Sequence, residues 1–312
     1  MLNKVCNKIS QLLLIWVILA AALGYYFPFM LAWMKPNIDW LFALTMLGIG
    51  MVTNPIDYKP MVKNPKFVGL GMLAHFGIMP VTSFFVAKIL HLPPELALGL
   101  ILAGAAPDAM ASSVVSYAAK ADVVYAIALT SVTTLVAPVL TPTFTYIFGH
   151  VYVKIPFLPM VLSIIKMVIV PLFLGLTIKH YFKSKIEKIE AVFPAISSIF
   201  IACICGLVVA LNKDFILKIS WLIFAAVFLL NAAGLFFGYQ AGKLFGFSVQ
   251  RRRTLALCVG MQNAGLGAVL AIKHFGAQAA VPNAIFATWC IISASIVAWF
   301  WNKTPATNEA AV

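Results

Sequence analysis

"GAAPDAMASS", residues 104–113, places a proline, an acid and two serines in the middle of an otherwise apolar stretch. Asp108 is the only formally charged residue between positions 96 and 119. A stretch of this length can cross a bilayer as a helix, which needs about 17–25 mostly apolar residues. Proline removes a backbone donor and clashes with the preceding turn. The segment therefore predicts a membrane helix that is interrupted near residues 105–109.

The whole chain has the composition of a membrane protein. It is 63% hydrophobic and 10% charged, with a mean hydropathy of +1.01, whereas soluble domains carry about 25% charged residues. The apolar runs are long and nearly continuous, which favours helices over a barrel of short alternating strands. Cutting the chain at its charged residues predicts an all-α integral membrane protein with ten transmembrane helices, in the windows 9–34, 40–56, 67–87, 96–119, 123–153, 155–178, 191–212, 219–242, 254–272 and 275–302.

The net charge of +13 is interpreted as a topology signal, because the basic residues are spread over short loops. With ten helices, most of the 22 basic residues fall on one side of the membrane, which is expected to be cytoplasmic together with both termini. The opposite side holds Lys35, Lys88, Lys154, Lys213, Lys218 and Lys273. We expect a multi-pass protein of the cell inner membrane, whose partner is the lipid bilayer and not a nucleic acid.

The five cysteines show no metal-ligand spacing, and four of them lie inside expected helices. They are expected to be free thiols, with no disulfide. They are Cys6, Cys203, Cys205, Cys258 and Cys290.

An internal echo divides the chain into two halves, 1–153 and 154–312. "VAKIL" (86–90) precedes the fourth window, and "QAGKLF" (240–245) precedes the ninth. Pro107 follows the lysine of the first motif by 19 residues, and Asn263 follows the lysine of the second by 20. Since five is an odd number, a second five-helix unit must enter the membrane from the opposite side. This is the inverted repeat of secondary transporters, whose paired broken helices meet near the bilayer midplane.

The ninth helix is expected to break at "GMQNAGLG" (260–267), where glycines loosen it. Carbonyls freed by a break attract a cation, and the N-terminal ends of the second half-helices attract an anion. Either break alone is well explained as a simple kink or a tight packing contact. Two breaks at matching repeat positions, each with polar neighbours, favour a binding site.

At these residues the chain resembles the bile acid:sodium symporter family, and the resemblance extends from helix 1 to helix 10. It implies two inverted five-helix repeats, a panel domain (helices 1, 2, 6 and 7) and a core domain (helices 3–5 and 8–10). In that family the broken helices 4 and 9 cross, with sodium ions behind the crossover and an organic anion in front. The matching stretches are "FGIMP" (76–80), "ASSVVSYAAKADV" (111–123), "LTSVTTLVAPVLTP" (129–142), "IIKMVIVPLFLGL" (164–176) and "VGMQNAGLGAVLA" (259–271).

The resemblance implies a set of sodium-side residues, some of which depart from the family pattern. Ser113 replaces an asparagine, Ala126 a serine, and Cys258 the glutamate that would ligate both ions. A thiol is a poor substitute, because a hard cation prefers oxygen. Asp108 stands where the family usually has glycine and restores one negative charge. The implied sodium residues are Ser112, Ser113, Thr130, Cys258, Val259, Met261, Gln262 and His75.

Asp108 has two interpretations, which are compatible with each other. An ionisable group deep in a membrane is a functional candidate, here a coupling acid. The same side chain could cap the second half-helix by accepting a hydrogen bond from the amide of Met110 or Ala111. His75 is interpreted mainly as a packing residue, with proton carrying as the alternative. Lys166 receives no coupling role.

On the anion side, the resemblance implies contacts from Met110, Ala111, Asn263, Ala264 and Cys290. Of the family's polar positions among them, only Asn263 keeps its polarity. The substrate therefore either differs from those of better-matched relatives or depends on half-helix N-termini and apolar contact.

Together these features predict a secondary active carrier of an organic anion, working by alternating access as a monomer. A bile salt or a small hydroxy acid such as pantoate suits the implied site. Sodium coupling is the family default, while proton coupling or uniport gains weight from Cys258 and Asp108. An intramembrane enzyme is disfavoured, since the chain has no HExxH or GxSxG motif and only nine acidic residues. A channel is the third alternative, and the paired breaks favour a carrier over it.

Overall fold

A computed structural model describes residues 5–6, 9, 12–54, 65–216 and 221–304. Within these ranges every regular element is a helix, and the one bridge of extended backbone joins Asp108 to Gln262. The expected all-α class is confirmed.

The helices of the first half of the chain are, in order, α2 (Leu13–Tyr26), α3 (Phe29–Ala32), η1 (Lys35–Asn37), α4 (Ile38–Val52), α6 (Pro65–Ile89), α7 (Pro94–Ala105), α8 (Ala111–Ala118) and α9 (Val123–Gly149). Those of the second half are α10 (Phe157–Ile164), η3 (Ile165–Ile169), α11 (Val170–Tyr181), α12 (Lys183–Ile186), η4 (Glu187–Ile189), α13 (Val192–Leu211), α14 (Lys213–Ile216), α15 (Trp221–Leu244), α16 (Val249–Gly260), α17 (Ala264–His274), η5 (Gln278–Ala280) and α18 (Val281–Lys303).

Six of these helices are long and apolar enough to cross a membrane: Pro65–Ile89, Val123–Gly149, Phe157–Tyr181, Val192–Leu211, Trp221–Leu244 and Gln278–Lys303. A seventh span results if α2 is counted with the segment Phe29–Val52, which is bent from it by 111°. The protein is therefore a multi-pass integral membrane protein.

Each of the ten apolar windows contains helix, but several of the helices are shorter than a full span. The fourth and ninth windows are each split into two half-helices, as the sequence predicts. The first two windows give helices of 14 and 15 residues, α2 and α4. By length alone, fewer helices are full spans than the ten windows predict.

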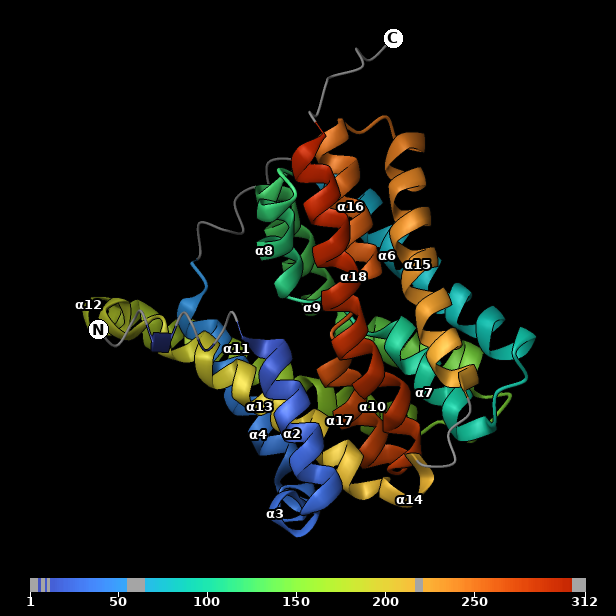
Figure 1. Cartoon of the computed structure of the whole chain (residues 1–312). Coiled ribbons are helices and arrows are strands. Elements are labelled where there is room, and N and C mark those ends of the chain that lie inside the picture. Colours follow the sequence, from blue (N-terminus) through green and yellow to red (C-terminus); the bar gives the residue numbers. More distant parts are fainter. Residues whose placement is uncertain (1–4, 7–8, 10–11, 55–64, 217–220, 305–312) are drawn as a thin grey trace.

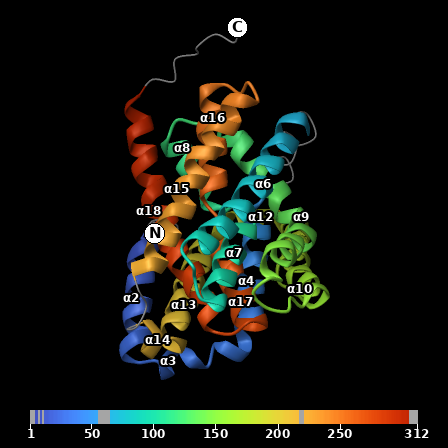
Figure 2. The same cartoon turned by 90° about the vertical axis from the view of Figure 1, so that its right-hand side faces the viewer.

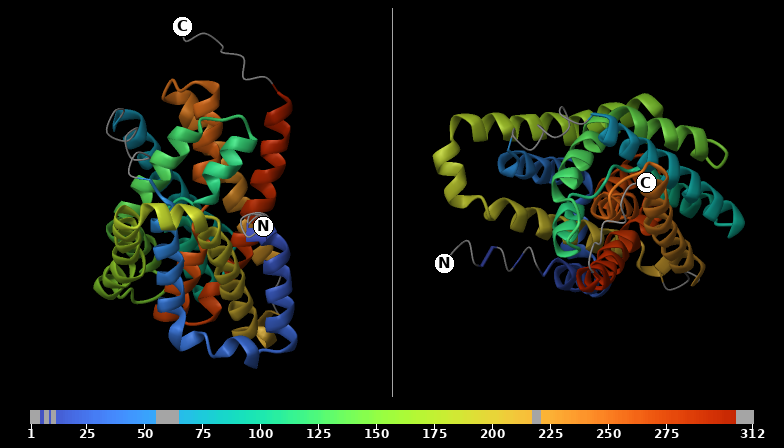
Figure 3. Two further views of the ribbon diagram at one scale, coloured as in Figure 1. Left: turned by 90° about the vertical axis from the view of Figure 1, so that its left-hand side faces the viewer. Right: turned by 90° about the horizontal axis from the view of Figure 1, so that it is seen from above.

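One set of helices, here called the side group, comprises α2, α3, α4, α13 and the continuous span Phe157–Tyr181. Glycine allows its helices to approach closely. A Cβ added to Gly24 would lie 2.1 Å from the carbonyl oxygen of Gly206, and one added to Gly50 would lie 2.2 Å from that of Leu172. Seen from above, α11 and α13 enclose one side of the molecule (Figure 3).

The remaining spans, α6–α9 and α15–α18, pack together as the main group (Figures 1 and 2). The half-helices run through its interior. Every residue from Leu96 to Ala105 in α7 is buried, and so is every residue from Ala264 to Ile272 in α17. The two breaks therefore lie deep inside the protein.

Candidate functional site

The first break is explained by its proline. The residue before a proline is disfavoured in helical geometry, and Ala106 adopts an extended conformation (φ −68°, ψ 154°) directly after α7. α8 resumes at Ala111. In the second break, Met261 is extended (φ −109°, ψ 117°), and α17 resumes at Ala264.

The two breaks bind each other through their backbones. The amide of Ala109 donates to the carbonyl of Met261 (3.1 Å), and the amide of Asn263 donates to the carbonyl of Pro107 (2.8 Å). These bonds flank an antiparallel bridge between Asp108 and Gln262. Segments that are about 155 residues apart in sequence thus form one polar centre, because backbone groups at this depth must be satisfied by protein partners.

Asp108 is the acid of this centre and is fully buried. Its Oδ2 accepts hydrogen bonds from the hydroxyls of Thr130 and Ser112, the latter at 2.9 Å. Its Oδ1 accepts no hydrogen bond from any residue that the structure describes. The N-cap position of α8 is Met110, and no side chain caps it. The structure therefore shows the Asp108 carboxylate bound by hydroxyl groups and not serving as the cap.

His75 of α6 contacts both broken helices and is also fully buried. Its Nδ1 lies 3.2 Å from the carbonyl oxygen of Cys258, and its Nε2 lies 3.0 Å from that of Ala106. A neutral imidazole has one N–H and can donate to only one of these carbonyls, whereas an imidazolium can donate to both. His75 is thus a buried packing residue whose two ring nitrogens both face backbone carbonyls, which agrees with the favoured interpretation from the sequence and also links the two broken helices.

The other expected sodium-side residues differ in their hydrogen-bond partners. The Cys258 thiol lies 3.6 Å from the hydroxyl of Ser112. Ser113 is half-buried and donates to the carbonyl of Met110, within its own segment. The Gln262 amide donates to the carbonyl of Val259 (2.8 Å), and its Oε1 is buried without a partner. Asp108 and Gln262 therefore each retain one unsatisfied oxygen at the bridge.

Two contributors were missed in the sequence. The Asn231 amide donates to the carbonyl of Gly260 at the end of α16 (2.8 Å), and the hydroxyl of Thr133 accepts from the amide of Asp108 (3.3 Å). Thr133 lies inside a stretch that resembles the family, and Asn231 is an amide in a long apolar helix. These two sequence features could have identified Thr133 and Asn231 as candidates. Side chains thus already satisfy part of the backbone that the breaks expose.

Among the residues expected to contact the anion, Asn263 caps α17, since its Oδ1 accepts a hydrogen bond from the amide of Leu266 (3.1 Å). It is half-buried, as are Met110 and Ala111, while Ala264 is buried. A Cβ added at Gly265 would lie 3.5 Å from the Phe42 ring of α4, so the start of α17 faces the side group.

Cys290 is buried in α18, and its thiol contacts the carbonyl of Ala287 in its own helix (3.7 Å). Lys166 is exposed in the π-helical turn η3 and does not join the centre. Among the described residues, Cys203, Cys205, Cys258 and Cys290 form no disulfide.

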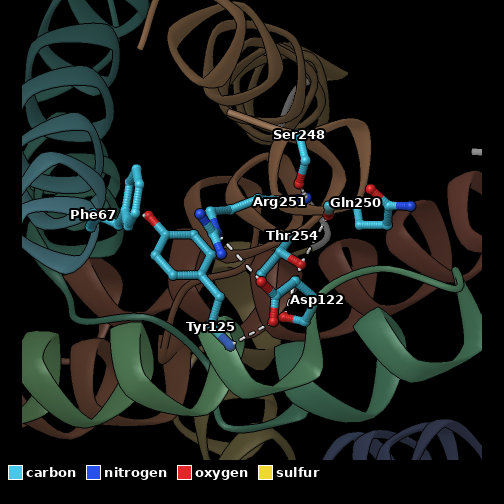
Figure 4. A network of polar contacts seen from close by, with 7 residues as sticks. All are labelled: Phe67, Asp122, Tyr125, Ser248, Gln250, Arg251 and Thr254. Atoms are coloured by element: carbon cyan, nitrogen blue, oxygen red, sulfur yellow. Dashed lines mark hydrogen bonds and ion pairs between the residues drawn. The ribbon is translucent and has the colours of Figure 1, made fainter. Parts of the chain in front are cut away.

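A second polar network lies in the main group, around the starts of α9 and α16 (Figure 4). Arg251 pairs with Asp122 (3.2 Å), and its guanidinium lies 4.5 Å from the centre of the Phe67 ring. Asp122 also caps α9 by accepting from the amide of Tyr125, whose hydroxyl donates to the carbonyl of Phe67. Within the main group, this network joins α6, α9 and α16.

The fold and this centre define the class of protein: a multi-pass membrane protein with two buried helix breaks that meet around an acid. A family model described as the sodium bile acid symporter family matches residues 40–219, more than half of the chain. The chain belongs to this family, and it is a transporter and not an enzyme.

Named relatives agree with this assignment. The uncharacterized sodium-dependent transporter YocS of Bacillus subtilis is 35% identical over 309 residues, covering 99% of this chain and 96% of its own. The probable chloroplastic sodium/metabolite cotransporter BASS1 of Arabidopsis thaliana is 34% identical, covering 96% and 75%. The human hepatic sodium/bile acid cotransporter is 27% identical, covering 71% and 65%.

Proposed function

We propose that the chain is a secondary active carrier that couples the movement of an organic anion to that of sodium. The observation that carries this proposal is the buried Asp108 carboxylate, whose free oxygen lies at the point where both broken helices meet. Two of the relatives are named as a sodium-dependent transporter and a sodium/metabolite cotransporter, which supports sodium as the coupling ion.

The residues around Asp108 fit a hard cation. Sodium is a transported ion here, and it prefers oxygen donors. The hydroxyls of Ser112 and Thr130 lie 3.2 Å apart beside the carboxylate, and the unpartnered Oε1 of Gln262 belongs to the residue that bridges Asp108. In this proposal Asp108 supplies the negative charge that the Cys258 thiol lacks, while Ser113, Val259 and Met261 are minor contributors.

The organic anion is proposed to bind on the opposite face, at the start of α8 and α17. The positive ends of half-helix dipoles favour a carboxylate. Met110, Ala111, Asn263 and Ala264 line that face, with Cys290 behind it. A bile-salt-like anion and a small carboxylate such as pantoate are both candidates, because the polar groups are few and the surroundings are apolar.

Transport is proposed to proceed by alternating access, with the main group moving against the side group. In this view the two groups correspond to a core and a panel domain, formed by ten helices in two inverted repeats, 1–153 and 154–312. The excess of basic residues at the Arg251 end supports an inner-membrane orientation with both termini in the cytoplasm. The carrier is proposed to act as a monomer.

The deciding experiment is uptake by the purified full-length chain in proteoliposomes, with sodium and proton gradients imposed separately. A radiolabelled bile salt and pantoate are the probes. An inward sodium gradient should drive uptake of at least one probe, and Asp108→Asn should abolish the sodium dependence. Asp122→Asn, which removes an acid outside the centre, is the matched control.

Proton coupling is the second candidate, because Asp108 and His75 are both ionisable groups within the centre. Uptake that follows the proton gradient and ignores sodium would replace the first proposal with this one. Uptake with neither gradient would indicate an uncoupled carrier.

A further inference from the structure

The side group and the main group are joined by polar contacts at the end of the molecule remote from Arg251. Among the described residues, all of these contacts come from residues 273–277, the segment that spans the end of α17. Lys273 forms an ion pair with Asp39 at the start of α4. The hydroxyl of Ser163 lies 3.0 Å from Nε2 of His274. The Asn212 amide donates to the carbonyl of Ala277 (2.9 Å).

The segment 273–277 therefore reaches three separate helices of the side group: α4, the span Phe157–Tyr181, and the end of α13. Gly276 adopts a positive φ of 100°, a conformation that glycine accepts without strain, and this turn precedes the carbonyl that Asn212 binds. Five consecutive residues thus join the main group to most of the side group.

These contacts are suited to break and form again. The Lys273 and Asp39 side chains remain 33% and 35% exposed, so water can replace each partner at low cost. A cavity of about 370 Å³ adjoins the seam and is lined by Asn212, Lys213, Ala277 and Gln278 among others. At this point polar contacts beside a cavity join the two groups.

The opposite end of the molecule has a different pattern. There Arg251 pairs with Asp122 inside the main group (Figure 4), and Lys179 of the side group pairs with Glu190, which lies just before α13. Arg253 donates to the carbonyl of Trp301, again within the main group. Of the ion pairs between described residues, only Lys273–Asp39 joins the two groups.

We propose that residues 273–277 are an outer latch: they close the seam on the side opposite Arg251, and the contacts to Asp39, Ser163 and Asn212 must open in each cycle for the anion to enter from that side. The latch builds on the proposed carrier function and adds to it the contact that keeps one entrance closed.

Cross-linking tests the latch directly. Asp39→Cys and Lys273→Cys are introduced together into a full-length chain whose five native cysteines are replaced and whose uptake of the bile salt or pantoate is verified. A short cleavable bis-thiosulfonate reagent should stop uptake, and reduction should restore it. The pair Asp122→Cys and Arg251→Cys lies within one group, so its cross-link should leave uptake intact. Undiminished uptake after cross-linking positions 39 and 273 would overturn the proposal.

A second measurement does not require transport. Asn263→Cys reports access to the site from the Lys273 side, through its rate of reaction with a membrane-impermeant thiol reagent. Adding Lys273→Ala should raise this rate by roughly two- to fivefold, the range expected for losing one half-exposed ion pair. The exchanged pair Asp39→Lys with Lys273→Asp should return the rate toward its original value. An unchanged rate in Lys273→Ala also overturns the latch, whereas a chain that never transports contradicts the carrier function alone.

Discussion

At the scale of single residues, the centre depends on one acid in an unusual position. A carboxylate buried without partners is strongly disfavoured. Asp108 has two hydroxyl donors on one oxygen and none on the other, so its environment is only half complete. A bound cation would complete it. Asp108 can therefore supply the negative charge for a cation, which the neutral thiol of Cys258 cannot.

Asn263 is expected to affect both stability and anion binding. Asn263→Ala removes the cap of α17, which should lower the free energy of unfolding by about 1 kcal/mol. It should also weaken binding of a transported anion, measured by equilibrium binding of whichever probe is taken up. Ser248→Ala removes the corresponding cap of α16, remote from the breaks. Equal anion affinity in both variants would place Asn263 outside the anion site.

At the scale of elements, the breaks themselves could be predicted because their causes are local. Pro107 and the glycines around position 263 disrupt the helix in which they occur. The partners of the exposed backbone could not be predicted in the same way. The contacts of His75 and Asn231 and the reciprocal bonds between residues 107–109 and 261–263 depend on α6, α15 and the two broken helices meeting in space. The sequence predicts carbonyls freed by each break, whereas in the structure those of Pro107 and Met261 accept backbone hydrogen bonds.

Helix contacts of the side group provide a stability test. Gly206 faces α2 so closely that an added Cβ would lie 2.4 Å from the carbonyl oxygen of Ala20. Gly206→Ala should lower the free energy of unfolding by about 1–3 kcal/mol, because the backbones must separate. The fall in melting temperature of the purified protein measures this. Gly69→Ala, where an added Cβ meets nothing within 4 Å, is the control. A melting temperature equal in both variants would contradict the close α2–α13 contact.

At the scale of the whole molecule, the positions of the basic residues at its two ends support the proposed orientation in the membrane. The start of α16, which carries Arg251, and the C-terminal end of α18 lie at one end of the molecule (Figure 1). The helices α14 and α17, which carry Lys213 and Lys273, lie at the other end. Apolar windows in the sequence were enough to predict a helical membrane protein. The number of full spans was harder to predict, because a window length does not reveal a 111° bend or a broken helix.

Orientation can be tested by labelling. A single cysteine at Ser248, beside the basic run Arg251–Arg253, should react with an impermeant reagent only from the cytoplasmic side. A cysteine at Gln278 should react only from the outside. Labelling of position 248 from outside intact cells would reverse the proposed topology.

The central claim is that the buried carboxylate of Asp108 holds the coupling ion. The most direct measurement is binding of radioactive sodium to the purified full-length chain, compared between the unaltered protein, Asp108→Asn and Asp122→Asn. We predict saturable binding that weakens at least about tenfold in Asp108→Asn, equivalent to about 1.4 kcal/mol, and that stays unchanged in Asp122→Asn. Sodium binding of equal affinity in all three proteins would contradict the account.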